Sequence, residues 1–232
     1  MAELQLDNPD RLKFIGHCMM DDKITVVQNW LGTDRAEDIA ARMGSIRDWS
    51  ARICDKDGGP RIIPPQALKD LGVTAEEYAR SYPDSLMRLA QGGTMAYLFF
   101  VKALREFDPG LFEWFETEFL EMANKLTNED LNYIEEPQVT MYSSGCFLGQ
   151  HSDGVGNRRI AFIANFTKNW QPDFGGCLTI QDSGKWSVIE PFFNSLALMD
   201  VSAGCNHYVS QVASWVPHNR LAIAGWVGKR EH

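Results

Sequence analysis

The residues best suited to chemistry are a histidine and an aspartate separated by one position, in His151-Ser152-Asp153. On an extended segment, residues i and i+2 project to the same face, so this imidazole and this carboxylate can bind one metal ion together. A second imidazole would complete the two-histidine, one-carboxylate set that holds iron(II) and leaves coordination positions open. Because such a pair also occurs by chance, it needs support from the rest of the sequence.

His207 is the favoured second histidine. It begins the run HYVSQV after a loop, within the same strand-rich half of the chain as the His-Ser-Asp motif. His218 is the competing candidate, but it lies in the turn-like sequence Val216-Pro217-His218-Asn219, which is typical of an exposed loop. The predicted metal ligands are therefore His151, Asp153 and His207.

Thirteen positions after His207, the run RLAIAGW places an arginine at the start of a predicted strand. Alternation puts Arg220, Ala222, Ala224 and Trp226 on one face of that strand. Arginine can bind a carboxylate through two parallel hydrogen bonds, and small alanines leave room for a slim dicarboxylate beside it. Taken alone, Arg220 would be an ordinary surface arginine; the motif and the distant histidine favour an anion-binding role.

Two cysteines lie close in sequence to the predicted ligands and raise the alternative of a zinc site. Cys146 precedes His151 and Cys205 precedes His207. The chain contains no CxxC pair, which is the usual framework of such sites. We therefore interpret both cysteines as small core residues.

Composition sets outer limits on the class of protein. The 232 residues suit one domain, and a formal net charge of -9 argues against nucleic-acid partners. No run of eighteen apolar residues and no basic-then-apolar leader is present, so we expect no membrane partner and a cytoplasmic location. The five cysteines, Cys18 included, are scattered and odd in number, which is typical of reduced thiols.

The chain changes character near Pro137. Residues 1–136 are predicted to be a mainly helical support region with an early strand, and residues 137–232 a strand-rich catalytic core. In the first region we expect a strand at 24–30, followed by a helix at 34–49 with Thr33 or Asp34 as N-cap. A loop is expected at 55–65. After it we expect a helical passage that is interrupted at 91–93 and resumes at 95–107, and then a helix at 112–126 that is started by Asp108-Pro109. The second region shows eight short apolar runs separated by turns, which favours a sandwich or open barrel buttressed by helices.

From Gln138 to Val227 the order of motifs resembles the prolyl-hydroxylase branch of the iron(II)/2-oxoglutarate dioxygenases. The matching runs are PQVTMYSSGCFLGQHSD, RRIAFIANFTKNW, FGGCLTI, IEPFFNSLALMD, NHYVSQV and RLAIAGWV. The resemblance implies an α+β, mainly β fold: a double-stranded β-helix, or distorted jelly roll, braced by the N-terminal helices. It also implies iron(II), 2-oxoglutarate and O2 as reactants, with ascorbate as a stimulant.

The resemblance further implies roles for individual residues. Arg220 would bind the distal carboxylate of 2-oxoglutarate, Tyr142 would line that pocket, and Asn165 would assist the arginine. Trp226 and Arg158 are candidates for the substrate pocket. The implied reaction is hydroxylation of a C–H bond, either in a prolyl or other residue of a peptide or in a free small molecule. A non-catalytic metal-binding jelly roll is the remaining alternative, and nothing in the sequence indicates an oligomeric state.

Overall fold

Short strands of alternating or fully apolar residues build one curled sheet. The computed structural model describes residues 24–55, 59–81, 95–182, 184–202 and 204–230, so Cys18 and residues 91–93 lie outside the described part. The strands are β1 (Ile24–Gln28), β2 (Ser50–Asp55), β3 (Gly59–Ile63), β4 (Tyr97–Ala103), β5 (Tyr133–Tyr142), β6 (Phe147–Ser152), β7 (Arg158–Asn165), β8 (Leu178–Asp182), β9 (Lys185–Ile189), β10 (Ser195–Asp200), β11 (Asn206–Val209) and β12 (Arg220–Gly228).

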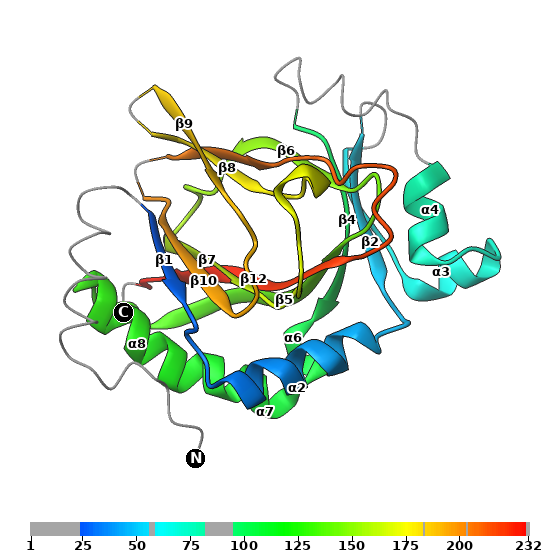
Figure 1. Ribbon diagram of the computed structural model, residues 1–232. Coiled ribbons are helices and arrows are strands. Elements are labelled where there is room, and N and C mark those ends of the chain that lie inside the picture. The colour runs from blue at the N-terminus through cyan, green and yellow to red at the C-terminus, as the bar shows by residue number, and fades with distance from the viewer. Residues whose placement is uncertain (1–23, 56–58, 82–94, 183, 203, 231–232) are drawn as a thin grey trace.

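All strand pairs are antiparallel, and the order along the sheet is β1-β10-β7-β12-β5-β4-β6-β11-β8-β9, with β2 on the other edge of β4 and β3 beyond it. Strand β4 makes the corner. Its C-terminal part pairs with β5 through Phe100 and Met141, whereas its N-terminal part pairs with β6 through Tyr97 and Leu148. The sheet therefore folds over on itself, so that its two halves face each other (Figure 1).

The helices lie outside the curled sheet, in two separate groups (Figure 1). They are α2 (Thr33–Gly44), α3 (Pro65–Asp70), α4 (Ala75–Ser81), α6 (Leu104–Phe107), α7 (Pro109–Trp114) and α8 (Leu120–Thr127), with a π-helical turn at Phe115–Phe119 and a 3-10 turn at Pro172–Phe174. Fully buried Phe115 and Phe119 pack on Phe162 of β7, with ring centroids 5.3 and 4.8 Å away. The predicted mainly β jelly roll braced by helices is confirmed.

Several predicted elements match and others do not. The early strand, the helix introduced by Asp108 and the eight C-terminal strands are present, and the Asp108 side chain accepts a hydrogen bond from the Leu111 amide at 2.9 Å. The predicted helix over 95–107 is wrong for most of its length: residues 97–103 form β4, and only Leu104–Phe107 at its end are helical, as α6. Its run YLFFV is buried on both faces, and a continuous apolar run does not distinguish a helix from a central strand.

The first region also contains more strand than predicted. The stretch 55–65 is not all loop, because Gly59–Ile63 form β3 against β2. Helix α2 begins at Thr33 after Gly32 as N-cap and ends at Gly44, short of Trp49. Strands β1 to β4 and the start of β5 precede Pro137, so the first 136 residues build part of the curled sheet as well as its bracing. No helix in the described ranges is long and apolar enough to cross a membrane.

Candidate active site

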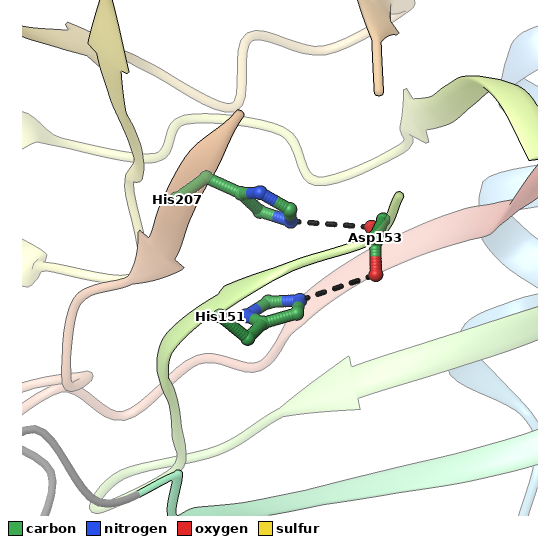
Figure 2. A group of neighbouring side chains, drawn as sticks. All are labelled: His151, Asp153 and His207. Carbon is green, nitrogen blue, oxygen red and sulfur yellow. Dashed lines mark ion pairs between the residues drawn. The ribbon is translucent and has the colours of Figure 1, made fainter. Parts of the chain in front are cut away.

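Strand register brings two distant histidines together. Strand β11 runs antiparallel to β6 with His207 directly opposite His151, and the two ring centroids are 4.1 Å apart. Asp153 follows the end of β6 and turns its carboxylate toward both rings (Figure 2). Its oxygens lie 3.5 Å from Nε2 of His151 and 3.2 Å from Nε2 of His207. One potential ligand atom from each residue lies within 4.8 Å of the others.

Backbone carbonyls fix the orientation of both rings. Nδ1 of His151 lies 2.9 Å from the Gly149 carbonyl, and Nδ1 of His207 lies 3.0 Å from the Cys205 carbonyl. Because a carbonyl only accepts hydrogen bonds, each Nδ1 must carry the proton in these contacts. The neutral form of each ring then offers the lone pair of Nε2 toward the common point, as a metal ligand requires.

Asp153 is held as a carboxylate. Burial works to raise the pKa of Asp153. Hydrogen bonds and positive charge from the protonated forms of His151 and His207 outweigh burial and hold that pKa well below its usual range. A metal ligand must be deprotonated, so this environment suits a divalent cation. Two imidazoles and one carboxylate also match the donor set used by non-haem iron(II), which leaves other positions for small ligands.

Arg220 is buried at the deep end of the same space. It is only 2% exposed, its Nη2 donates to Oδ1 of Asn165 at 3.1 Å, and its Nε has no hydrogen-bond partner. Burial lowers the pKa of Arg220. Within the described ranges no carboxylate forms an ion pair with it; the Tyr142 ring, 5.2 Å from the guanidinium carbon, is its aromatic neighbour. A buried cation without a counter-charge is costly, so this site fits an incoming carboxylate.

Asn165 accepts the hydrogen bond from Arg220 and is itself held in place by Ser195. Its Nδ2 donates to Oγ of Ser195 at 3.1 Å, and that hydroxyl donates to the Phe192 carbonyl at 2.7 Å. These bonds orient the amide so that its oxygen faces Arg220. Asn165 is not among the residues lining the cavity, so the structure gives it contact with the arginine and no position against a ligand.

One cavity of about 290 Å³ joins these groups. Its lining includes His151, Asp153, His207, Arg220, Tyr142, Trp226 and Arg158. Apart from Asn165, the predicted site residues therefore gather around one space, although their roles as ligands stay predictions. Ala224 also lines it, whereas Ala222, predicted on the same face, does not.

At the more exposed end of the cavity, here called its mouth, the Arg158 guanidinium lies over the Trp226 ring. The guanidinium carbon is 3.7 Å from the indole centroid. Arg158 also donates to Oε1 of Glu135 from Nε at 3.0 Å and from Nη2 at 2.5 Å. Hydrogen bonding from Arg158 is the largest cause that lowers the pKa of Glu135, and burial acts in the opposite direction. The mouth arginine is thus already paired within the chain.

Sequence reasoning missed the contribution of the start of β5. Glu135 holds Arg158, while Glu136 and Gln138 line the cavity together with Arg52 of β2. The signal was present as Pro137 inside a strand, since proline within a sheet marks an edge or a bulge. The register confirms the irregularity: Gln138 pairs with Ala224 and Glu135 pairs with Trp226, so three steps along β5 match two steps along β12.

The competing residues lie elsewhere. His218 is exposed, 6.4 Å from the Phe174 ring, and is not in the metal-binding cluster found among the described residues. Cys146 and Cys205 are buried core residues, 0% and 2% exposed, and neither belongs to that cluster. The geometry therefore favours His207 over His218 and gives the zinc alternative no support.

Comparisons with known proteins point to one family. The model described as "2OG-Fe(II) oxygenase superfamily" matches residues 137–228, which contain all three clustered residues and Arg220. A mouse protein, "Prolyl 3-hydroxylase OGFOD1", is 30% identical over 116 residues, which cover 47% of this chain and 21% of that protein. The Ostreococcus tauri "Prolyl 3,4-dihydroxylase OGFOD1" is 29% identical over 39% of this chain and 20% of its own length. The chain thus spans about a fifth of these curated relatives.

Solved structures share the fold over nearly the whole chain. A Pseudomonas putida prolyl-4-hydroxylase aligns with a TM-score of 0.59 and 15% identity, covering 95% of this chain and 100% of that one. A Trichoplax adhaerens prolyl hydroxylase, solved with a hypoxia inducible factor peptide fragment, aligns with a TM-score of 0.63 and 14% identity, covering 96% and 90%. At these identities the likeness establishes the fold.

Proposed function

We propose, since this chain belongs to the 2OG-Fe(II) oxygenase superfamily through residues 137–228, that it hydroxylates an unactivated C–H bond at the expense of 2-oxoglutarate and O2. The products would be the hydroxylated substrate, succinate and CO2. The observation that carries the proposal is the pairing, in one cavity, of a two-histidine, one-carboxylate cluster with a buried arginine that has no carboxylate partner.

Each group in the cavity has a task in this reaction. His151, Asp153 and His207 would hold iron(II), which supplies the oxidative chemistry when 2-oxoglutarate and O2 bind. Arg220 would bind the distal carboxylate of 2-oxoglutarate, with Asn165 keeping the guanidinium in place. Tyr142 stacks on Phe99, with ring centroids 5.2 Å apart, and closes the side of that pocket. The enclosed wall would keep water from the reacting groups.

The proposed substrate is a prolyl residue. Its support is that curated relatives from mouse, Ostreococcus tauri and Drosophila melanogaster are named as prolyl hydroxylases. Hydroxylation of a free amino acid or natural-product intermediate is the alternative. A single domain over residues 1–232, a cytoplasmic location and the absence of nucleic-acid partners remain predictions from the sequence.

Succinate formation tests the proposal. The purified chain is incubated with iron(II), 2-oxoglutarate, O2, ascorbate and a proline-containing peptide pool, and succinate and a mass gain of one oxygen are followed. We expect both products from the wild type and neither from His151→Ala or Asp153→Ala. A wild type that binds iron and 2-oxoglutarate but forms no succinate with any pool would instead support a non-catalytic binding protein.

A further inference from the structure

A second hollow continues the catalytic cavity along the concave face of the sheet. It has a volume of about 490 Å³ and shares Arg52, Glu136 and Gln138 with the first cavity. Its remaining wall comes from β2, β3, β4, β5, α6, the start of α3 and Asp48 before β2, with Ser50, Ile62, Pro65 and Val101 among the lining residues. The three shared side chains line both spaces, so the two spaces adjoin there.

The strand register shows how the two spaces run on. Phe99 of β4 lines the first cavity, and Val101 and Ala103, two and four positions further along the same strand, line the second. Successive residues of a strand rise by about 3.3 Å, so the second space extends roughly 13 Å beyond Phe99. That length corresponds to about four residues of an extended peptide.

A bulge in β5 shapes the boundary. Glu136 has a φ of 46°, a backbone conformation uncommon for residues other than glycine, and Pro137 follows it without an amide hydrogen. Bulges bend a strand and re-aim its side chains, often beside active sites. Here Glu136 and Gln138 both reach the boundary between the cavities.

The contacts across the boundary are loose. Nη1 of Arg52 lies 3.4 Å from Oε1 of Gln138, and Nη2 lies 3.7 Å from Oε2 of Glu136. Both distances exceed those of good hydrogen bonds, so a guest that offers amide groups can replace them at low cost. Beyond the boundary, Ile62 is 59% exposed and lies opposite Arg52 across the β2–β3 pair. An exposed apolar side chain in a groove is available to a ligand.

We infer that the second space is a docking groove for the substrate chain: an extended peptide lies over Ile62 and Val101 and crosses between Arg52 and Gln138 to place its target residue at the metal centre. The inference rests on the proposed function and specifies its substrate class. The first cavity is small by the standard of ligand pockets, roughly 300–1,000 Å³, and must also hold 2-oxoglutarate. It therefore takes one side chain, and the groove takes the neighbouring residues.

Peptide length and groove variants test this inference. Two pools are compared: acetylated, amidated tripeptides with a central proline, and eleven-residue peptides with five randomised residues on each side of proline. At low peptide concentration, where the rate reports kcat/KM, we expect the long pool to be hydroxylated at least about tenfold faster per proline, since one buried apolar contact is worth about that factor. Equal rates for the two pools, or for free proline, would overturn the groove.

Ile62→Asp places a charge on an exposed position of the groove, and Ser50→Tyr fills the groove from the neighbouring strand β2. We expect either change to lower the rate with the long pool about tenfold. Val188→Asp is the matched control: Val188 is 63% exposed on edge strand β9 and lines neither space. Identical rates for Ile62→Asp and Val188→Asp, with both folded, would refute the inference.

Failure of the proposed function and failure of the groove inference give different experimental results. If the wild type forms no succinate from 2-oxoglutarate with any substrate, the proposed function fails and the groove loses its basis. If it forms succinate and hydroxylates short substrates as well as long ones, the proposed function stands and the groove is refuted. A long pool that is neither hydroxylated nor retained by the iron-loaded protein would also refute the groove.

Discussion

The deep end and the mouth of the catalytic cavity are each built around an arginine and an aromatic ring, yet they treat the charge differently. Arg220, at the deep end, lies 5.2 Å from Tyr142 and has an amide oxygen as its hydrogen-bond acceptor. Arg158, at the mouth, lies 3.7 Å from Trp226 and pairs with the carboxylate of Glu135. The mouth is neutralised by the chain itself, whereas no carboxylate among the described residues pairs with the arginine at the deep end.

The difference assigns the two ends to different partners. Because a buried cation is stabilised strongly by an incoming carboxylate, the deep end favours a dianionic small molecule and holds it firmly. At the mouth, a ligand has to compete with Glu135 for the donors of Arg158, so a hydrogen bond from Arg158 to the ligand replaces one to Glu135. We therefore expect tight co-substrate binding at depth and weaker, exchangeable contacts to the substrate at the opening.

The metal cluster lines the same cavity, and removing one of its residues has the largest expected effect. His207→Ala removes a nitrogen donor that no neighbouring side chain replaces. We expect succinate formation to fall by roughly a hundredfold or more, since even partners of metal ligands are worth about ten- to a hundredfold. Bound iron per chain, measured by metal analysis, should fall in parallel.

His218→Ala is the matched control for that experiment, because it removes an exposed imidazole on the loop before Arg220. It should retain wild-type iron content and activity. The opposite pattern, with His218→Ala inactive and His207→Ala active, would show that the cluster of His151, Asp153 and His207 is not the metal site.

Arg220→Ala tests the deep end directly. Loss of a charge-assisted hydrogen bond costs about 1.5–3 kcal/mol, so the KM for 2-oxoglutarate should rise by roughly ten- to a hundredfold. Iron binding should remain, because Arg220 lies outside the cluster of potential metal ligands. An unchanged KM for 2-oxoglutarate would mean that the buried arginine does not bind the co-substrate.

Asn165→Ala should produce a smaller change of the same kind. It removes the acceptor for Nη2 of Arg220 and the link to Ser195, at a cost of about 1 kcal/mol. We expect the KM for 2-oxoglutarate to rise about fivefold, with kcat for succinate formation less affected. Asn165→Asp would give Arg220 a carboxylate within the chain, and we expect that carboxylate to compete with 2-oxoglutarate and weaken its binding further. Tighter binding of 2-oxoglutarate would contradict the proposal that Arg220 binds its distal carboxylate.

Glu135→Gln should have the smallest effect and should act at the mouth alone. The pair with Arg158 is partly exposed, and pairs of this kind contribute about 0.2–1 kcal/mol. We expect at most about a threefold change in the KM for the peptide substrate and no change in the KM for 2-oxoglutarate. If the 2-oxoglutarate KM changed instead, the separation of the two ends would be wrong.

The lowered pKa of Glu135 determines the pH below which its ion pair with Arg158 is lost. A carboxyl group whose pKa is lower in the folded protein stabilises the fold above its unfolded pKa. That contribution is lost as the pH falls through the folded value. The ion pair with Arg158 should therefore persist over the neutral range, where we expect the wild type to be more stable than Glu135→Gln. The difference in their free energies of unfolding should disappear as the pH falls through the folded pKa of Glu135.

Much of the catalytic half was predictable because its signals are local. His151 and Asp153 are two positions apart, so the strand period alone puts them on one face. Arg220 heads a strand with clear alternation, and the order of motifs supplied its relation to His207. Within the described ranges these residues do gather in one cavity, although metal and co-substrate binding remain to be measured.

The first half was harder because its strands depend on distant partners. The run Tyr97–Val101 is apolar at every position, since β4 is buried between β2 on one edge and β5 and β6 on the other. Such a run lacks the alternation that distinguishes a strand from a helix. Glu135 and Arg52 were missed for a related reason: their contacts reach across strands, and no local pattern reports a bulge that redirects them.

The direct pairing of His207 with His151 also limits how the chain can change length. Side chains of a strand alternate with a period of two, so one residue inserted or deleted within β11 would turn His207 to the opposite face. The ten residues between Val209 and Arg220 form no strand, and a change of length there leaves both strands in register. Insertions and deletions among descendants of this sequence should therefore collect in that connection and spare β6 and β11.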